Sequence, residues 1–389
     1  MQFEFRSATR ILFGPGTVSE IPALVRNLGA RALLVTGSNP QRAKPVLDAL
    51  SAASVRTAIF RCPGEPTVEL VREGVRAAGE CEVIVGLGGG SAIDCAKAIA
   101  ILATNSGEPL DYLEVNGKGR PLENAPLAFV AIPTTAGTGA EVTRNAVLES
   151  SEHKVKASLR SPLMPAKIAV VDPDLTLDLP PEVTASTGLD TLTQLIEPFV
   201  SIRANAFTDM FCREGLPQVA NALETAFHDG RNKTARTSMS YASLLSGLAL
   251  SNAGLGVIHG FAAPLGGSLH APHGALCASV LPYGMAANIA ALRQRAPEDT
   301  ALEKYKQVAR MLTGREDAQP EDGVTWVASL CRRLSIRALE DYGLSADQIP
   351  ALVENAARAS STKANPIVLT PKELTRVAQR ALTADSIEF

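Results

Sequence analysis

The chain has 389 residues, of which 46% are hydrophobic and 20% charged, and its formal net charge is −3. This length favours two domains, and the composition is ordinary for a globular enzyme. No block of basic residues indicates a nucleic-acid-binding surface, so we expect no nucleic-acid partner.

The N-terminal segment MQFEFRSATR carries charges and lacks the apolar core of a signal peptide, so we expect a cytoplasmic protein. The six cysteines form no CxxC pair, which indicates free thiols in a reducing compartment and no structural zinc motif. Two short apolar runs, Phe3–Phe5 and Arg10–Phe13, are predicted as edge strands or as a hairpin.

The first half of the chain alternates β-branched runs with helical patterns. The predicted strands are Arg31–Thr36, Glu82–Gly86, Leu127–Ile132 and Lys167–Val171, and the predicted helices are Ala43–Ala53, Glu69–Ala78 and Ser91–Leu102. This alternation predicts βαβ units around a mostly parallel sheet. From about Pro181 the patterns are long and helical, so we place an α/β domain at residues 1–178 and an all-helical domain at residues 179–389.

A glycine-rich stretch, VGLGGGSAIDCAKAIA, covers Val85–Ala100. We expect a buried strand to end at Gly86 and a helix to begin at Ser91, with Gly88, Gly89 and Gly90 between them. Glycines let the backbone approach a ligand closely, and a helix N-terminus favours phosphate. The stretch therefore predicts a phosphate-binding loop, with a positive φ at Gly89. Its spacing is not GxGxxG, and the alternative is a tight strand-to-helix turn that needs glycine.

A second polar loop, IPTTAGTGAEVT, follows another predicted buried strand and spans Ile132–Thr143. Its hydroxyl groups come from Thr134, Thr135, Thr138 and Thr143. Ligands of parallel sheets bind at the carboxyl ends of the strands, where both loops would lie. A loop with no ligand is the alternative for this segment taken alone.

The segment Thr237–Leu292 contains no Asp, Glu, Lys or Arg, yet it holds three of the five histidines of the chain: His259, His270 and His273. It is long enough to span a membrane, but glycines and prolines interrupt it. We therefore expect buried helices of a helical domain and no membrane partner.

His259 and His273 are fourteen residues apart, which is about 21 Å along one helix. We expect Gly266-Gly267 and Pro272 to break the helix, so that the chain turns back and the imidazoles share a metal ion. A second apolar helix, Ser186–Ser201, is expected to be capped near Ser186 or Thr187 and carries Asp190 and Gln194 on one face.

Asp190 with His259 and His273 leaves one position open, as in a catalytic metal site. Each histidine taken singly has an alternative interpretation as a hydrogen-bonded core residue.

Together these residues resemble the iron-containing (group III) alcohol dehydrogenases. The resemblance runs from Arg10 to Leu382 and rests on GGGSAID, IPTTAGTGAEVT, PAKIAVVDP, GLDTLTQLIEPFVS and the pair HG…PHG between His259 and Gly274. It implies a dinucleotide-binding α/β domain and an all-α domain, the dehydroquinate synthase-like fold, with the cofactor between them and one divalent metal. We also expect a homodimer or a higher homo-oligomer.

Carried over by position, the resemblance implies roles for named residues. Gly88, Gly89, Gly90, Ser91 and Asp94 would hold the pyrophosphate and its surroundings; Thr134, Thr135, Thr138 and Thr143 would line the nicotinamide side, with Lys156 near the ribose. Asp190, His259 and His273 match three metal ligands of the family.

Three positions depart from the family pattern. Gln194 stands where the family usually has a histidine, so we expect it to be a weaker fourth metal ligand and the ion to be iron or zinc. Ala263 replaces a histidine that the family assigns to proton transfer or nicotinamide positioning. We expect His270 to take over that role, and the alternative is that His270 is only a loop residue. Gly37 replaces the acid of the NAD-using members.

Gly37 opens the segment GSNPQRAK, which ends at Lys44. Without a carboxylate, nothing at this position repels a 2′-phosphate, and Ser38 and Asn39 can donate hydrogen bonds to one. Arg42 or Lys44 would add positive charge, although both residues also suit a solvated surface helix. The segment thus favours NADP over NAD.

The sequence therefore predicts a metal-dependent NAD(P) alcohol dehydrogenase that acts on a small alcohol and its aldehyde or ketone. The metal would serve as a Lewis acid and the nicotinamide would carry the hydride. A metal-free reductase resembling the maleylacetate reductases is the alternative that Gln194 leaves open. Dehydroquinate synthase, a relative by fold, is disfavoured by the motif order.

Overall fold

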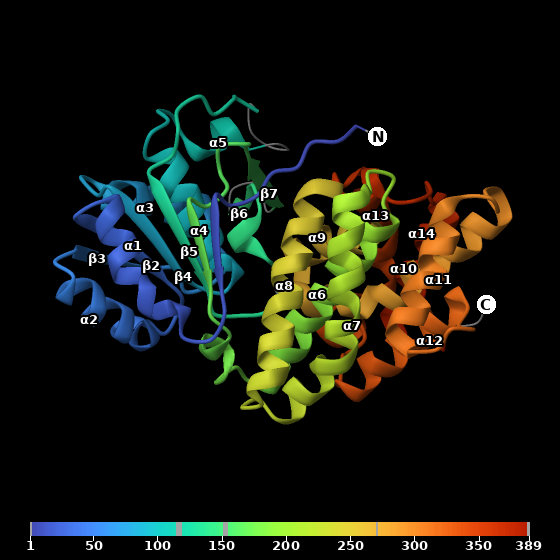
Figure 1. Cartoon of the computed structure of the whole chain (residues 1–389). Coiled ribbons are helices and arrows are strands. Elements are labelled where there is room, and N and C mark those ends of the chain that lie inside the picture. The colour runs from blue at the N-terminus through green and yellow to red at the C-terminus, as the bar shows by residue number, and fades with distance from the viewer. Residues whose placement is uncertain (1, 114–118, 151–154, 270, 387–389) are drawn as a thin grey trace. The chain divides into compact units, whose positions relative to one another are not determined.

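The computed structural model describes residues 2–113, 119–150, 155–269 and 271–386. The chain divides into an α/β unit, Arg6–Leu177, and a helical unit that combines Asp178–Phe389 with the N-terminal residues through Phe5 (Figure 1). The predicted boundary after residue 178 lies one residue from this division.

The α/β unit is built on a six-stranded sheet in the order β1-β8-β5-β4-β2-β3. All neighbouring strands in it are parallel. Its strands are β1 (Arg10–Phe13), β2 (Arg31–Thr36), β3 (Arg56–Arg61), β4 (Val83–Gly88), β5 (Ala128–Pro133) and β8 (Ile168–Val171). A separate antiparallel pair joins β6 (Asn145–Ser150) to β7 (Val155–Arg160). The parallel α/β sheet predicted from the alternating pattern is confirmed.

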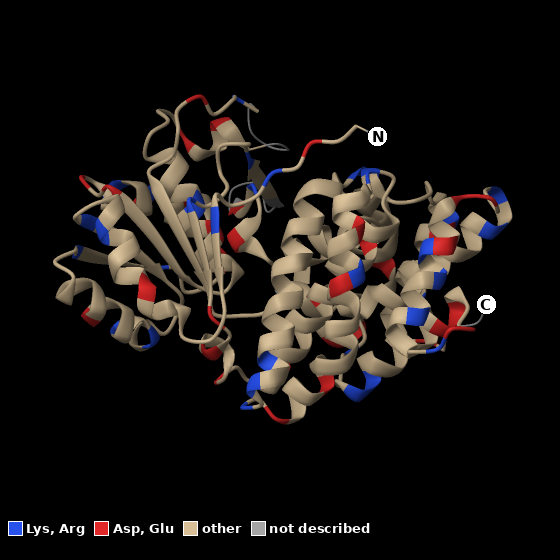
Figure 2. Cartoon of the chain, viewed as in Figure 1, with Lys and Arg blue, Asp and Glu red and all other residues tan. Residues whose placement is uncertain are grey.

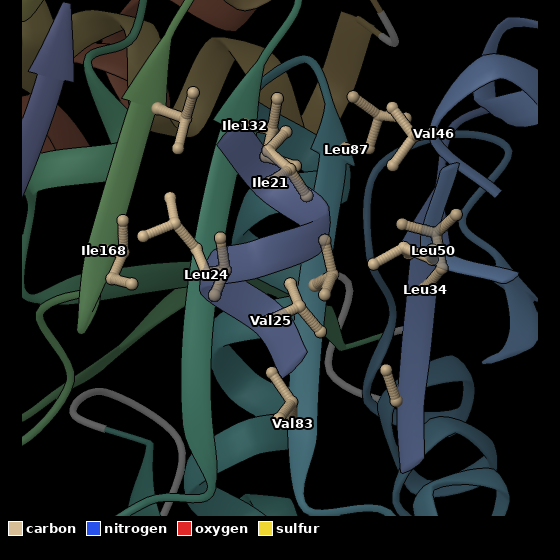
Figure 3. Packing of buried hydrophobic residues seen from close by; sticks show 14 of the residues in the cluster. Ile21, Leu24, Val25, Leu34, Val46, Leu50, Val83, Leu87, Ile132 and Ile168 are labelled. Atoms are coloured by element: carbon tan, nitrogen blue, oxygen red, sulfur yellow. The ribbon is translucent and has the colours of Figure 1, made fainter. Parts of the chain in front are cut away.

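Helices cover both faces of this sheet. They are α1 (Ile21–Leu28), α2 (Lys44–Ala52), α3 (Val68–Ala78), α4 (Gly90–Leu102) and the short α5 (Pro109–Tyr112). Figure 3 shows Ile21, Leu24 and Val25 of α1 packed across the sheet, in one cluster with side chains of β2, β4, β5 and α2. On α4, side chains such as Ile93 and Ala96 contact Gly86 of β4, which has no side chain of its own to separate helix from strand.

The predicted N-terminal hairpin is wrong. Arg10–Phe13 forms β1, but it pairs in parallel with β8. Residues 3–5 form no strand, and Phe3 and Phe5 instead stack on Phe207 of the helical unit, with ring centroids 5.2 and 5.7 Å apart. The aromatic side chains find an apolar partner there, which explains why these residues belong to the helical unit.

The helical unit contains no strand among its described residues, as the sequence predicts. Its helices are α6 (Pro181–Val200), α7 (Ala206–His228), α8 (Lys233–Ala253), α9 (Val257–Leu269), α10 (His273–Arg295), α11 (Thr300–Thr313), α12 (Pro320–Arg333), α13 (Ile349–Arg358) and α14 (Pro371–Thr383). The expected cap near Ser186 is wrong, because α6 begins a turn and a half earlier, with Pro181 at its first position. Proline suits that position because its missing N–H has no partner there.

The charge-free segment forms the core of this unit. α10 is long and apolar enough to cross a membrane, but 83% of its apolar window is buried inside the protein. α8 and α9 are bent by 100° at Gly254 to Gly256, and α9 carries no Lys, Arg, Asp or Glu (Figure 2). α10 is therefore a core helix, and its apolar character reflects packing against other helices.

Candidate active site

One face of α6 presents three polar side chains inside the apolar core. Asp190, Gln194 and Glu197 are spaced by four and three residues, which places them on the same side of the helix. Each of them is at most 4% exposed. Buried groups of this kind need partners, since an unpaired charge in the interior costs several kcal/mol.

The two histidines come from different helices. His259 lies in the first turn of α9, and His273 is the first residue of α10. Their ring centroids are 5.4 Å apart, so the predicted return of the chain occurs. Its predicted cause is partly wrong: Gly266 and Gly267 lie within α9, whereas Pro272 stands at the break, as the N-cap of α10.

Gly274 explains how α10 approaches α6. A Cβ atom at this position would lie 2.2 Å from the carbonyl oxygen of Ser186 and 3.0 Å from Cβ of Asp190. Only a residue without a side chain allows the helices to come this close. The glycine of the PHG motif thus brings the first turn of α10 against the carboxylate of Asp190.

A cluster of possible metal ligands results. Oδ1 of Asp190 lies 3.4 Å from Nε2 of His259 and 4.0 Å from Nε2 of His273. The thiol of Cys277, one turn along α10, lies 3.7 Å from Nε2 of His273. One donor atom from each of these four residues lies within 4.8 Å of the other three.

Two atoms of the cluster are buried without a hydrogen-bond partner: Oδ1 of Asp190 and Nε2 of His259. The other ring nitrogen of His259, Nδ1, lies 2.6 Å from a carboxylate oxygen of Glu197. If Nδ1–H donates to Glu197, the lone pair on Nε2 is directed at the carboxylate of Asp190. A cation between them satisfies both atoms, and a carboxylate behind a ligating histidine is the usual outer contact of such a site.

The ionisation of the side chains in this cluster also favours a bound cation. Burial alone raises the pKa of Asp190, but contact with His259 and the charge of His273 outweigh it and lower the pKa. Burial likewise opposes ionisation of Cys277, yet the two imidazoles lower the pKa of its thiol. The Cys277 thiolate in turn raises the pKa of His273 to about 9. The anionic donors favour a cation, and a metal ion would displace protons from the imidazoles.

Gln194 stands beside this cluster, hydrogen-bonded within the protein. Its amide nitrogen donates to Oδ2 of Asp190 at 2.9 Å, and its carbonyl oxygen accepts from the hydroxyl of Ser246 at 3.0 Å. A carboxylate can only accept, so this orientation of the amide is the favourable one. Gln194 thereby fixes one oxygen of Asp190 and leaves the other free for a ligand.

Sequence reasoning missed two residues of the site. Cys277 is four residues after His273 and Glu197 is seven after Asp190, so both spacings place them on the helix faces already identified. Their helical spacing from His273 and Asp190 was the sequence signal that could have identified them. Ala263 is exposed on α9, and His270 lies outside the described residues.

In the α/β unit, the four glycines near the end of β4 serve different purposes. A Cβ atom built on Gly86 would lie 2.8 Å from Ala96, and one built on Gly88 would lie 2.7 Å from Ala92. A Cβ atom built on Gly90 would lie 2.9 Å from Thr138. At Gly89 it would meet only Thr135, at 3.4 Å, which is ordinary contact. The expected positive φ at Gly89 is wrong: its φ is −73°, and the positive value, 159°, belongs to Gly88.

The start of α4 is nonetheless open to an anion. Gly89 is the N-cap of α4, no side chain caps the helix, and Ser91 lies in its first turn. Unsatisfied N–H groups and the helix dipole favour a phosphate at such a position. β4 extends to Gly88 and α4 begins at Gly90, so the turn is tighter than the sequence indicates.

The threonine loop, Ile132–Thr143, meets the glycine loop because β4 and β5 are parallel neighbours. The backbone N–H of Thr134 donates to the carbonyl of Gly88 at 2.9 Å. Thr135 lies next to Gly89 and Thr138 next to Gly90. The first part of the loop is therefore placed where a ligand of the glycine loop would lie.

Thr143 and Asp94 have structural partners. Nζ of Lys97, 1% exposed, donates to the hydroxyl of Thr143 and to the carbonyls of Ala140 and Asn145 at 2.7–2.9 Å, and lies 3.6 Å from the carboxylate of Asp94. Burial raises the pKa of Asp94 to about 6 despite this cation. Lys156 lies in β7, but its side chain is outside the part of the structure that is described.

We expect Lys97→Met to destabilise the α/β unit strongly. The change removes a buried cation and its contacts with Asp94 and Thr143, and breaking a buried ion pair by removing one partner costs about 3–5 kcal/mol in comparable cases. Thermal unfolding of the full chain measures the loss. The control is Lys44→Met, which breaks an exposed ion pair with Asp48 and should change stability by less than about 0.5 kcal/mol. Equal melting temperatures for both variants would contradict the structural role of Lys97.

The loop after β2 adjoins the glycine loop, because the backbone nitrogen of Gly37 lies 3.6 Å from a Cβ built on Gly88. Nothing lies within 4 Å of a Cβ built on Gly37. Asn39 caps the following turn by accepting from the N–H of Gln41, and Nη2 of Arg61 donates to the carbonyl of Ser38 at 2.8 Å. Arg61 is thus a cation at this loop that the sequence did not identify.

Comparison with known proteins matches both halves of the chain to family models. Residues 8–173 match the model described as iron-containing alcohol dehydrogenase. Residues 184–382 match the model described as the C-terminal part of the Fe-containing alcohol dehydrogenase family.

Individual relatives agree with these matches. Alcohol dehydrogenase 4 of Saccharomyces cerevisiae (strain ATCC 204508 / S288c) is 34% identical over 377 residues, covering 95% of this chain and 96% of the yeast protein. The NAD-dependent methanol dehydrogenase of Bacillus methanolicus is 31% identical, covering 95% and 97%. The crystal structure of a 1,3-propanediol oxidoreductase superposes with a TM-score of 0.91 at 31% identity, covering 98% of this chain and 100% of that one.

Proposed function

Because the chain belongs to the iron-containing alcohol dehydrogenase family, we propose that Asp190, His259 and His273 bind the divalent metal of a nicotinamide-dependent alcohol dehydrogenase. The protein is an oxidoreductase that interconverts alcohols with aldehydes or ketones and depends on a metal. The two unpartnered buried atoms, Oδ1 of Asp190 and Nε2 of His259, are the observation that carries this assignment.

The residues of the chain have distinct tasks in this reaction. When bound, the metal supplies a Lewis acid for the alcohol or carbonyl oxygen of the substrate, and the nicotinamide supplies or accepts the hydride. Glu197 fixes the ring orientation of His259 through Nδ1, and Gln194 fixes the carboxylate of Asp190. The burial of Asp190, His259 and Glu197 strengthens the charge interactions among them.

The dinucleotide is assigned to the α/β unit. Gly88, Gly89, Gly90 and Ser91 are proposed to bind the pyrophosphate at the N-terminus of α4, with Thr134, Thr135 and Thr138 beside it. The contacts of Asp94 and Thr143 with Lys97 support a role for both in shaping these loops.

The experiment that tests this function is an assay of alcohols and aldehydes with NAD(H) and NADP(H) under defined metal loading. The proposal expects reversible turnover of small primary alcohols or diols that requires a bound divalent ion. Full turnover by protein shown to contain no metal would contradict it.

A separate prediction concerns the choice of cofactor. We expect wild-type protein to prefer NADP, because Gly37 offers no carboxylate and Arg61 lies at the same loop. A charge-assisted contact to the 2′-phosphate contributes about 1.5–3 kcal/mol, or roughly tenfold to a hundredfold in affinity. Gly37→Asp has room for its side chain and should reverse the preference. The measurement is kcat/KM for both cofactors, and a tenfold preference for NAD in the wild type would refute the prediction.

A further inference from the structure

We propose that Cys277 is the fourth protein ligand of the metal, in the place that the sequence suggests for Gln194, and that this thiolate makes the site selective for zinc. The inference rests on the proposed function, since it concerns the same metal site. It adds a soft ligand to a set otherwise composed of one carboxylate and two imidazoles.

The donor atoms of the cluster are spaced closely enough to share one ion. Bonds of about 2.0–2.3 Å in a tetrahedral arrangement place ligand atoms about 3.3–3.6 Å apart. The observed separations are 3.4 Å between Asp190 and His259, 4.0 Å between Asp190 and His273, and 3.7 Å between His273 and Cys277. Small side-chain rotations therefore bring the four donor atoms onto one ion.

Gln194 is oriented by a contact within the protein. Its amide nitrogen donates to Oδ2 of Asp190, so its carbonyl oxygen, the atom that would bind a metal, faces the hydroxyl of Ser246 and is directed away from Asp190. Turning the amide would set two oxygens against each other and would break the contact that orients Asp190. The favourable role for Gln194 is to hold the carboxylate, which leaves a coordination position for another side chain.

Cys277 is held at the cluster by its position on α10. It lies one turn after His273 on a core helix, so its sulfur is held on the same face as the imidazole. The side chain is fully buried. Another buried thiol of this unit, Cys331, donates to the carbonyl of Ala278, whereas the sulfur of Cys277 contacts the imidazole of a proposed ligand. The unpartnered atoms of Asp190 and His259 mark the position of the ion between them.

The consequence is a change in metal preference. Thiolates bind zinc and other soft or borderline ions strongly, whereas carboxylate and imidazole ligands also suit ferrous iron. A site with one thiolate should therefore retain zinc more tightly, relative to ferrous iron, than the same site without it.

The test compares full-length wild type with Cys277→Ser and with a matched control, Cys331→Ser, which removes a buried thiol outside the cluster. Each protein is loaded with one equivalent of cobalt(II), and the near-ultraviolet thiolate-to-cobalt charge-transfer band is recorded. Zinc-loaded samples are examined by X-ray absorption for a sulfur neighbour at about 2.3 Å. Zinc and ferrous affinities are measured by competition with chelators.

The proposal expects the charge-transfer band and the sulfur neighbour in the wild type and in Cys331→Ser, and neither in Cys277→Ser. It also expects Cys277→Ser to lose at least about tenfold in zinc affinity, with a smaller loss for ferrous iron. Stoichiometric metal with no sulfur signal in the wild type would overturn the inference and leave the proposed function intact. If the wild type bound none of cobalt, zinc and ferrous iron and still showed full turnover, both this inference and the proposed function would be wrong.

Discussion

Asp190→Ala is expected to abolish metal binding and to reduce kcat/KM by at least about a thousandfold, which is about 4 kcal/mol of transition-state stabilisation. Asp190 supplies the only carboxylate of the described cluster, and its Oδ1 lies within 4.0 Å of Nε2 in both histidines. Without it, His259 and His273 share no anionic partner on α6, and the Lewis acid that the reaction needs is lost.

The fold should survive this change, because the only hydrogen bond of the carboxylate among the described residues is the one that Oδ2 accepts from Gln194, and Oδ1 has no partner. Metal content, turnover and melting temperature are measured together. Glu224→Ala, which breaks a half-exposed ion pair with Arg333 on the same unit, is the control and should leave all three unchanged. If Asp190→Ala kept both its metal and its activity, the ligand assignment would be wrong.

Gly89→Val is expected to weaken cofactor binding at least a hundredfold while the protein still folds and still binds its metal. The φ of −73° at Gly89 is accessible to valine, and a Cβ there meets only Thr135 at ordinary contact distance. The branched side chain would instead occupy the space at the N-terminus of α4 that the pyrophosphate needs.

A contrasting variant separates binding from folding. Gly86→Val places its Cβ 2.8 Å from Ala96, in the contact between β4 and α4, and should therefore destabilise the fold itself. Cofactor titration and thermal unfolding of both variants distinguish the two effects. Unchanged cofactor affinity in Gly89→Val would contradict the assignment of the phosphate site to this loop.

The strands that the sequence predicts well are the central ones. β2 and β5 are buried on both faces, so their apolar runs stand out, and Arg31–Thr36 was predicted with its observed bounds. β3, with the sequence RTAIFR, was missed because it is an edge strand whose side chains are mostly exposed. Its exposed positions mix Arg56 and Arg61 with Ala58 and Ile59, so the strand shows neither a continuous buried run nor a clean alternation of apolar and polar residues.

The site was predictable to the extent that it follows helix periodicity. Asp190 and Gln194 share a face because they are four residues apart, and their side chains do hydrogen-bond. The function of each polar group was not predictable, because it depends on tertiary neighbours. Ser246 engages the carbonyl of Gln194 from another helix, and Gly274 allows the close approach of α10 to α6 that brings His273 to Asp190.

The most direct test of the whole account is removal and return of the metal. Wild-type protein is dialysed against a strong chelator until no divalent metal is detected, and alcohol oxidation is followed by formation of reduced nicotinamide. The account predicts that turnover disappears with the metal and returns when about one equivalent of zinc or ferrous ion per chain is restored. Full activity in the metal-free protein would contradict it.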